Sequence, residues 1–322
     1  MSTTLNMPTM ISYTPQETIE LVSRNGVRRG NMRPDKTFLG AVSAGCMLSL
    51  AAGGSLLVTA LPWYAENAPG ICKMLSAIVF PIALVLIVFT GGELFTGSTM
   101  ITGVAVLHGR LPVKNMLMHW FLCFWGNFAG CLFVMAIFMG YGGIFDHDPY
   151  KSQVITFVTS KQLTPHWHQI FIRAIGCNWL VCLAIYMSMQ GKEVVSKVVG
   201  MYTPVFVFVL LGFDHVAANM FFIPLGLWVG TPGLTIPLYI WKGIIPAALG
   251  NMIGGTVFCA SYYYYMFIYG EPDIMIDGVY YRHVDLARVQ GRMEEGAVTT
   301  IRATPEQSGD ETAGSTGLDF KS

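Results

Sequence analysis

Residues 212–220 read GFDHVAANM, and this short polar stretch separates two apolar segments. The chain carries no charge between Lys197 and Asp214, so two ionisable side chains follow a long apolar run. Ionisable residues inside a membrane segment are costly and usually mark a functional position. His215 titrates near neutral pH, which makes it the stronger functional candidate. Asp214 is as well explained by capping or anchoring a half-helix as by direct contact with a substrate.

A second interruption occurs at residues 89–98, which read FTGGELFTGS. Clustered glycines make a continuous helix unfavourable, by roughly 1 kcal/mol each. Irregular backbone at membrane depth is tolerated only inside protein or along a cavity. We interpret Glu93 as a structural carboxylate that caps a half-helix. The backbone at Leu94, Phe95 and Thr96 is the better candidate for lining a path.

The composition places both interruptions in a membrane protein. The chain has 322 residues, of which 53% are hydrophobic and only 12% are charged. Soluble domains carry about 25% charged residues. The charges of this chain are concentrated in the flanks outside residues 37–270, so this central region must face lipid. A net charge of zero also argues against a nucleic-acid-binding protein.

The central region divides into six apolar segments, which predict an all-α membrane fold. They are residues 37–61, 74–107, 113–140, 169–190, 199–228 and 242–268. The second and fifth segments are too long for one simple span, and they contain the two interruptions. Lys and Arg residues near the spans are more numerous on the side that carries both termini, which predicts cytoplasmic termini. We expect the protein to lie in the plasma membrane.

The two halves of the membrane region show an internal repeat. Residues 81–88 (PIALVLIV) match residues 204–211 (PVFVFVLL) in character, and residues 126–130 (GNFAG) recur as residues 250–254 (GNMIG). A repeat of three spans must be inverted in the membrane. Inverted repeats with broken helices place a binding site near the bilayer midplane, as in transporters and channels. Chance similarity between apolar segments is the alternative.

The flanks predict two further parts of the chain. Residues 1–36 include Thr14-Pro15-Gln16-Glu17, a capping-box pattern that favours a short amphipathic helix on the cytoplasmic face, with a frayed tail as the alternative. Residues 271–322 are hydrophilic, and we expect disorder beyond about residue 290. The transport domain is then residues 37–270.

Other polar residues leave alternatives open. Asn178 and Asn251 lie in apolar segments, where each must hydrogen-bond either another helix or the lining of a pore. The cysteines lie mostly in apolar runs and are interpreted as packing residues. We find no enzyme signature and predict no metal or cofactor site. A metal at His166 and His168 is disfavoured, because these residues lie at a span boundary.

Taken together, four motifs resemble the formate/nitrite transporter family. They are residues 91–96 (GGELFT), 177–184 (CNWLVCLA), 213–221 (FDHVAANMF) and 250–255 (GNMIGG). The resemblance covers about residues 37–268, with the motifs in the family's order. One departure is Asp214, where the family usually has the longer glutamate.

The resemblance implies an aquaporin-like hourglass subunit in a homopentamer, with one substrate pore in each subunit. His215 would be the central histidine, with Thr96 and Asn251 hydrogen-bonding near it. Two apolar constrictions would flank this site. The implied cytoplasmic ring is Leu84, Leu94 and Val181, and the implied outer ring is Phe80, Phe95 and Phe208. Lys161 is the best match to the family's lysine in the outer vestibule.

This arrangement leads to a hypothesis for transport. Stripping water from an anion costs several kcal/mol, whereas a neutral acid pays far less at an apolar constriction. We hypothesise that Lys161, with His166 and His168, attracts a small monovalent anion, which gains a proton near His215. Nitrite is the preferred substrate, because the long hydrophilic tails suggest a eukaryotic, fungal-type nitrite transporter.

Three alternatives remain at this point. A broad weak-acid channel would conduct formate, lactate or hydrosulfide as well. A non-transporting protein would be a membrane enzyme using the His166–His168 pair, or a receptor that signals through its tail. Water or glycerol conduction is disfavoured, because the paired Asn-Pro-Ala signature of that fold is absent and Asn219 precedes Met220.

Overall fold

The computed structural model is all-helical and describes residues 12–278. Within this range, six helical stretches are long and apolar enough to cross a membrane. They are Pro34–Leu57, Pro69–Phe89, Val113–Tyr141, Trp167–Gln190, Val194–Leu211 and Ile236–Phe267. The predicted six-span, all-α fold is therefore confirmed, and the second and fifth spans are broken as expected.

The first half of the chain runs from the N-terminal helix to the third span. Its elements are α1 (Pro15–Gly30), α2 (Pro34–Leu57), α3 (Pro62–Asn67), α4 (Pro69–Val79), α5 (Ile82–Phe89), α6 (Phe95–Leu107), α7 (Val113–Phe133) and the π-helix η1 (Val134–Tyr141). The second span is formed by α4 and α5, and the short helix α6 continues it after a non-helical stretch at residues 91–94.

The second half follows a connecting segment, α8 (Tyr150–Val158) and η2 (Thr159–Leu163). Its elements are α9 (Trp167–Gln190), α10 (Val194–Leu211), α11 (Val216–Trp228), α12 (Ile236–Leu238), η3 (Tyr239–Ile244), α13 (Ile245–Ile253), η4 (Gly254–Ser261) and α14 (Tyr262–Phe267). The fifth span breaks at Gly212, which has a φ of 71° and ends α10, a conformation that glycine adopts without steric cost.

An asparagine of the third span fixes the break in the first half. The Asn127 Oδ1 atom accepts a hydrogen bond from the backbone N–H of Phe95 at 2.9 Å, where α6 begins. Its Nδ2 atom donates to the backbone oxygens of Glu93 at 2.9 Å and Ala41 at 2.8 Å. Asn127 therefore satisfies backbone groups that the interrupted helix leaves free.

The sixth span repeats this arrangement at the second break. The Asn251 Oδ1 atom accepts from the backbone N–H of Val216 at 2.8 Å, where α11 begins. Its Nδ2 atom donates to the backbone oxygens of Asp214 at 3.1 Å and Ala174 at 2.7 Å. Equivalent residues in the two halves thus make the same three contacts, which supports the repeat found in the sequence.

The glycines of the repeated motif allow the helices to approach closely. A Cβ atom at Gly130 would lie 2.1 Å from the backbone oxygen of Val42, and one at Gly254 would lie 2.3 Å from that of Ile175. Such contacts are possible only without a side chain, as in other tightly packed membrane helices. Packing of α7 on α2, and of the sixth span on α9, therefore depends on these glycines.

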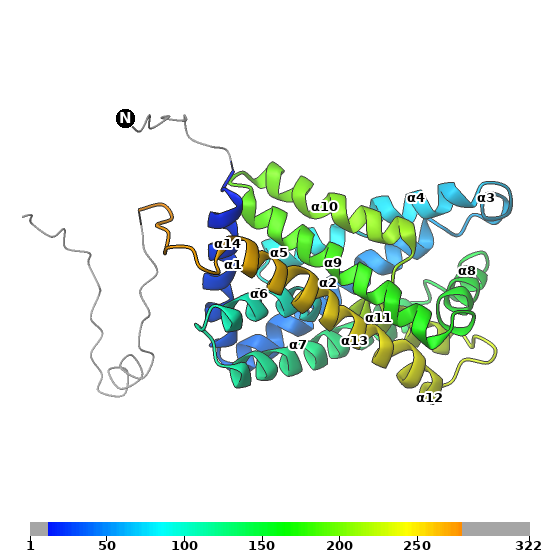
Figure 1. Ribbon diagram of the computed structural model, residues 1–322. Coiled ribbons are helices and arrows are strands. Elements are labelled where there is room, and N and C mark those ends of the chain that lie inside the picture. Colours follow the sequence, from blue (N-terminus) through cyan, green and yellow to red (C-terminus); the bar gives the residue numbers. More distant parts are fainter. Residues whose placement is uncertain (1–11, 279–322) are drawn as a thin grey trace, which may run out of the picture. The chain divides into compact units, whose positions relative to one another are not determined.

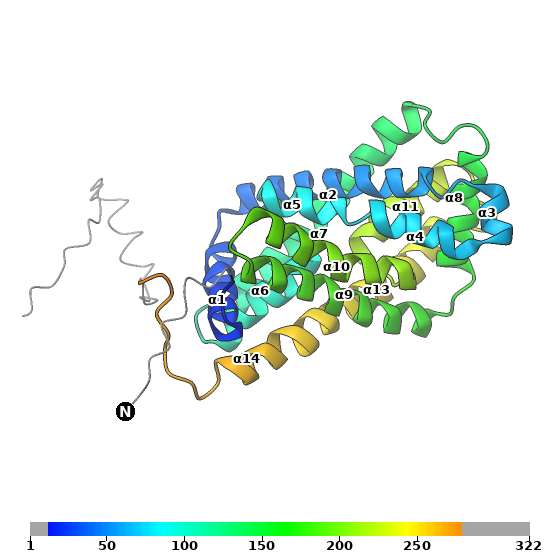
Figure 2. The same ribbon diagram turned by 90° about the horizontal axis from the view of Figure 1, so that it is seen from above.

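The N-terminal helix α1 lies across one end of the bundle, at a steep angle to most other helices (Figures 1 and 2). Its predicted capping box forms. The Thr14 side chain accepts a hydrogen bond from the Glu17 backbone N–H, and the Thr14 backbone N–H donates one to the Glu17 carboxylate. Ile19 and Val22 are fully buried, so the helix is packed against the bundle rather than frayed. The stretch predicted to be disordered, beyond about residue 290, lies outside the described residues.

Candidate functional site

A cavity of about 410 Å³ leads to the second break from the end of the bundle opposite α1. It is bordered by α4, α8, α9 and α10, and its lining combines polar, charged and aromatic side chains. Among the lining residues are Lys73, Lys161, Arg173, Phe80, Phe208 and His215. The cavity therefore joins a cationic mouth to an aromatic end.

His215 lies at the inner end of this cavity and is almost fully buried. It is the N-cap of α11, and its Nδ1 atom accepts a hydrogen bond from the backbone N–H of Ala218 at 3.2 Å. Its Nε2 atom lies 2.9 Å from the Thr96 hydroxyl oxygen on α6. Because Nδ1 is an acceptor, the neutral ring carries its proton on Nε2 and donates it to Thr96. The two breaks therefore meet at one polar contact.

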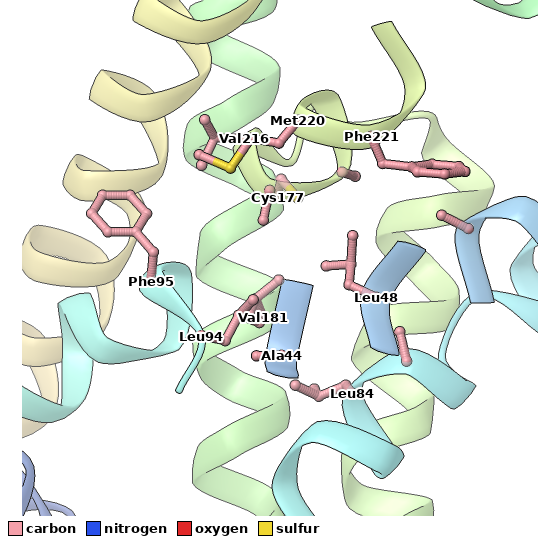
Figure 3. Packing of buried hydrophobic residues seen from close by; sticks show 14 of the residues in the cluster. Ala44, Leu48, Leu84, Leu94, Phe95, Cys177, Val181, Val216, Met220 and Phe221 are labelled. Carbon is pink, nitrogen blue, oxygen red and sulfur yellow. The ribbon is translucent and has the colours of Figure 1, made fainter. Parts of the chain in front are cut away.

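A much smaller apolar cavity, of about 20 Å³, follows on the other side of His215. Leu84, Leu94 and Val181, which the family resemblance places in one ring, all line it together with Leu48. In Figure 3 the side chains of Leu94 and Val181 lie side by side, and Leu48 and Leu84 face the same space. The space between these groups is too small for a hydrated ion.

The aromatic side of His215 differs from the predicted outer ring in one member. The rings of Phe80 and Phe208 pack edge to face at 5.9 Å, and Phe222 stacks on Phe80 at 6.3 Å. Phe95 lies elsewhere, with its ring against Trp120 and Phe124 of α7. Phe95 is the first residue of α6, and its ring contacts place its side chain against α7. Phe222, which the sequence analysis missed, takes its place.

Two cations meet the Asp214 carboxylate beside the larger cavity. The Lys161 Nζ atom lies 3.0 Å from Oδ1, and the Arg173 Nε atom lies 2.8 Å from Oδ2. Lys161 also donates to the backbone oxygen of Phe213 at 3.2 Å. Asp214 is fully buried and offsets only one of the two positive charges. The local charge is therefore positive, which favours an anion.

Arg173 was not among the predicted site residues. The sequence did contain a signal for it, namely an isolated charge: Arg173 is the one Asp, Glu, Lys or Arg residue between Lys161 and Lys192. Sequence alone does not show that it shares a carboxylate with Lys161, because the three residues come from three different segments. The structure brings them together at the wall of the cavity.

The two asparagines brace the backbone around His215. The Asn178 Nδ2 atom donates to the backbone oxygens of Thr96 at 3.2 Å and Asn251 at 2.6 Å, and to the Thr99 hydroxyl at 2.9 Å. Both asparagines are fully buried, and neither is among the residues that line the two cavities. Of the two alternatives left open, contact between helices is the one that the structure shows.

Two other polar predictions have different outcomes. Asn127 caps the half-helix, whereas the Glu93 carboxylate pairs with Arg29 of α1 at 2.7 Å, so Glu93 anchors the N-terminal helix.

The rings of His166 and His168 stack at 5.8 Å at the start of α9. They border a shallow surface cavity together with Arg173.

Comparisons with known proteins agree with this geometry. Residues 16–265 match the family model for the formate/nitrite transporter. A probable formate transporter of Methanothermobacter thermautotrophicus is 35% identical over 212 residues, which cover 62% of this chain and 77% of the relative. The formate channel FocA of Haemophilus influenzae is 31% identical over 265 residues, which cover 77% of this chain and 92% of the relative.

Solved structures share the fold. An ion channel of this family superimposes with a TM-score of 0.70 and 25% identity, covering 78% of this chain and 98% of the other. A pentameric formate channel with formate bound gives a TM-score of 0.65 and 28% identity, covering 73% and 98% of the two chains. These relatives are transporters and channels rather than enzymes. The chain belongs to the formate/nitrite transporter family of membrane proteins.

Proposed function

We propose that this channel for weak-acid anions carries nitrite into the cell together with a proton, with His215 as the central residue. The observation that carries the proposal is the order of the lining groups from the larger cavity to the smaller one. A cation pair is followed by an aromatic constriction, then by a buried imidazole, and then by an apolar ring. This order attracts an anion and afterwards favours a neutral molecule.

Attraction of the anion would occur at Lys161 and Arg173. Both side chains line the larger cavity, and their shared carboxylate on Asp214 leaves an excess of one positive charge. A charged group in the low-dielectric wall of a cavity produces a strong local potential, and this potential raises the concentration of the counter-ion in the cavity. Salt would weaken this attraction, since the mouth of the cavity is open to water.

Passage beyond Phe80 and Phe208 would require a neutral species. A monovalent anion loses its water there and finds only aromatic and aliphatic side chains, at a cost of several kcal/mol. The Nε2–H group of His215 and the hydroxyl of Thr96 are the nearest polar groups. We propose that a proton from the outer water reaches the anion at this point, either through water or by way of His215, which takes up that proton as it gives one to the anion and so ends neutral. Nitrous acid then crosses the ring of Leu84, Leu94 and Val181.

The assembly and the orientation belong to the same proposal. A homopentamer is supported by the related channel that is described as pentameric. Cytoplasmic termini are supported by the excess of Lys and Arg on the side of the termini, and a plasma-membrane location is part of the same proposal. In this orientation the larger cavity faces outward and α1 lies on the cytoplasmic face.

A second candidate function is conduction of formate by a channel without proton coupling. Relatives that match over most of this chain are named formate channels. The side chains around His215 and in the apolar ring would fit either anion, because both are small and monovalent. The two candidates therefore differ in accumulation against a gradient rather than in the geometry of the path.

The decisive experiment is uptake of nitrite and formate into proteoliposomes at pH 5 and pH 8, with and without an imposed proton gradient. Accumulation of nitrite driven by the gradient, with weak competition from formate, would support proton-coupled nitrite transport. Equal fluxes of both anions without accumulation would support the channel. Absence of flux for both anions would remove the anion path itself.

A matched variant tests the role of His215 separately. His215→Phe keeps an aromatic ring and removes the titratable group and the contact with Thr96. We expect it to lose the dependence of uptake on pH. Unchanged pH dependence in this variant would rule out protonation at His215 as part of the mechanism.

A further inference from the structure

We propose that Glu93, His119 and Cys123 form a binding site for a borderline-soft divalent cation such as Zn²⁺, separate from the anion path. The three residues are buried, and their ligand atoms all lie within 4.8 Å of one another. They come from two elements, because Glu93 lies in the loop between α5 and α6 whereas His119 and Cys123 lie on α7.

The distances suit a common metal ion. The Sγ atom of Cys123 lies 3.4 Å from the Nε2 atom of His119, and this Nε2 atom lies 3.7 Å from the Glu93 Oε2 atom. Ligands of tetrahedral zinc, bound at about 2.0 to 2.3 Å, are separated by about 3.5 Å. An ion between the three atoms would therefore need only small side-chain movements.

The positions on α7 are also those of a helical ligand pair. His119 and Cys123 are four residues apart, so both side chains project from the same face of the helix. Thiolate, imidazole and carboxylate together are a ligand set typical of Zn²⁺ and other borderline ions. The Ser98 hydroxyl oxygen lies 3.1 Å from His119 Nε2 and completes the polar wall, leaving water or Ser98 as a fourth ligand.

A buried polar atom remains to be explained at this site. His119 Nδ1 has no hydrogen-bond partner in the described part of the chain, and Nε2 of the same ring is directed to Ser98 and Cys123. A buried imidazole without a complete set of partners is costly. Coordination through Nε2 would place the ring proton on Nδ1, and this N–H would need a water molecule as its acceptor, as is common for histidines that bind zinc.

The positive charge of Arg29 repels a metal ion at this site. Its contact with Glu93 nevertheless leaves other lone pairs of the carboxylate free to bind one. Its Nη1 atom lies 2.7 Å from Glu93 Oε2, and the carboxylate offers about four lone-pair directions. A ligating carboxylate commonly accepts a second hydrogen bond of this kind. On binding, the Cys123 thiol loses its proton to water. The positive charges of Zn²⁺ and Arg29 then exceed the negative charges of Glu93 and the Cys123 thiolate by one.

The site would add a link between elements that Asn127 of α7 already holds together through the backbone oxygen of Glu93. Glu93 precedes Leu94 of the apolar ring and holds α1 through Arg29, while α7 supplies the other two ligands. A bound ion would therefore immobilise the loop at residues 90–94 against α7. This consequence can be measured in the absence of any transported anion.

The experiment uses the full-length protein in nanodiscs, without a polyhistidine tag, titrated with Co²⁺ and then with Zn²⁺. We expect one Co²⁺ per chain with a thiolate charge-transfer band, and displacement of the ion by Zn²⁺. Cys123→Ser should abolish the band, and His119→Gln should weaken binding about tenfold or more. Cys131→Ser, a buried cysteine on the same helix, should leave both unchanged.

Two further measurements keep the result unambiguous. In a variant with His166→Ala and His168→Ala the band should persist, and its loss would move the ion to the surface pair and overturn the proposal. Amide exchange at residues 90–94 should slow when Zn²⁺ is added to the wild type but not to Cys123→Ser. Persistence of the band in Cys123→Ser, or absence of a band in the wild type, would also overturn it.

Discussion

At the scale of single residues, the contact between His215 and Thr96 carries a first prediction. Thr96→Val keeps the shape of the side chain but removes the acceptor of His215 Nε2–H, at 2.9 Å in the wild type. An unpaired buried donor costs about 1 to 3 kcal/mol. We expect a lower melting temperature and a severalfold lower rate of nitrite uptake, measured by thermal unfolding and in proteoliposomes. Thr203→Val, at an exposed position on α10, is the control and should change neither.

Lys161 carries a second prediction at the same scale. Lys161→Met removes one of the two cations that share Asp214. Loss of a charge at the wall of the cavity should raise the KM for nitrite about five- to tenfold, with a smaller change in kcat, and reduce the salt dependence of uptake. Lys242→Met provides the control, because the Lys242 ammonium bonds the Leu163 backbone oxygen away from the cavity. An equal rise in KM for both variants would contradict a specific role for Lys161.

The residues of the site were predictable to different degrees. His215 and Thr96 were found because polar groups beside broken apolar segments are rare, and their motifs resemble a family. Phe95 was placed wrongly, because the direction of a side chain at the start of a half-helix depends on the helix packed beside it. Phe222 and Arg173 were missed, since an aromatic residue inside an apolar half-helix and a basic residue near the start of a span both have several ordinary explanations.

At the scale of elements, the two capping asparagines predict equal effects in the two halves. Asn127→Ala and Asn251→Ala each leave the first backbone N–H of a half-helix without its partner. We expect each to destabilise the fold by about 1 to 2 kcal/mol, which thermal unfolding in detergent would detect. Asn67→Ala, at an exposed position, should have little effect. A large loss for one asparagine and none for the other would show that the two breaks are not equivalent.

The elements themselves followed from the sequence more closely than their details did. Glycine clusters and long apolar runs located both breaks, because they raise the cost of a continuous helix. The π-helical segments η1 and η4 were not predicted. They occupy corresponding positions after α7 and α13, and their wider turns depend on tertiary packing rather than on a local pattern.

At the scale of the whole molecule, the docking of α1 should depend on pH. The His108 Nδ1 atom bonds the Ser23 hydroxyl at 3.0 Å and lies 3.8 Å from the Glu20 carboxylate. Burial, together with the Arg110 cation, lowers the pKa of His108 below its usual 6.5. The unfolded state therefore binds the proton more tightly, so stability is full above about pH 6.5 and is lost as the pH falls.

We expect residues 15–30 to have lower amide-exchange protection factors, which correct for the pH dependence of intrinsic exchange, at pH 5 than at pH 7.5. His108→Gln should remove most of this difference, because it keeps a polar side chain beside Ser23 and cannot be charged. His147→Gln, in the segment before α8, serves as the control and should keep the difference. Equal protection factors at both pH values in the wild type would show that His108 does not govern the docking of α1.

The contacts of α1 also impose an order on the synthesis of the chain. The helix leaves the ribosome first, yet its partners come later: Arg29 needs Glu93, and Glu20 needs Arg110. The N-terminal segment therefore cannot reach its final position until the second span is complete and the third is about to follow. In a nascent chain stopped before residue 93, this amphipathic segment would still be exposed to the membrane surface and to chaperones.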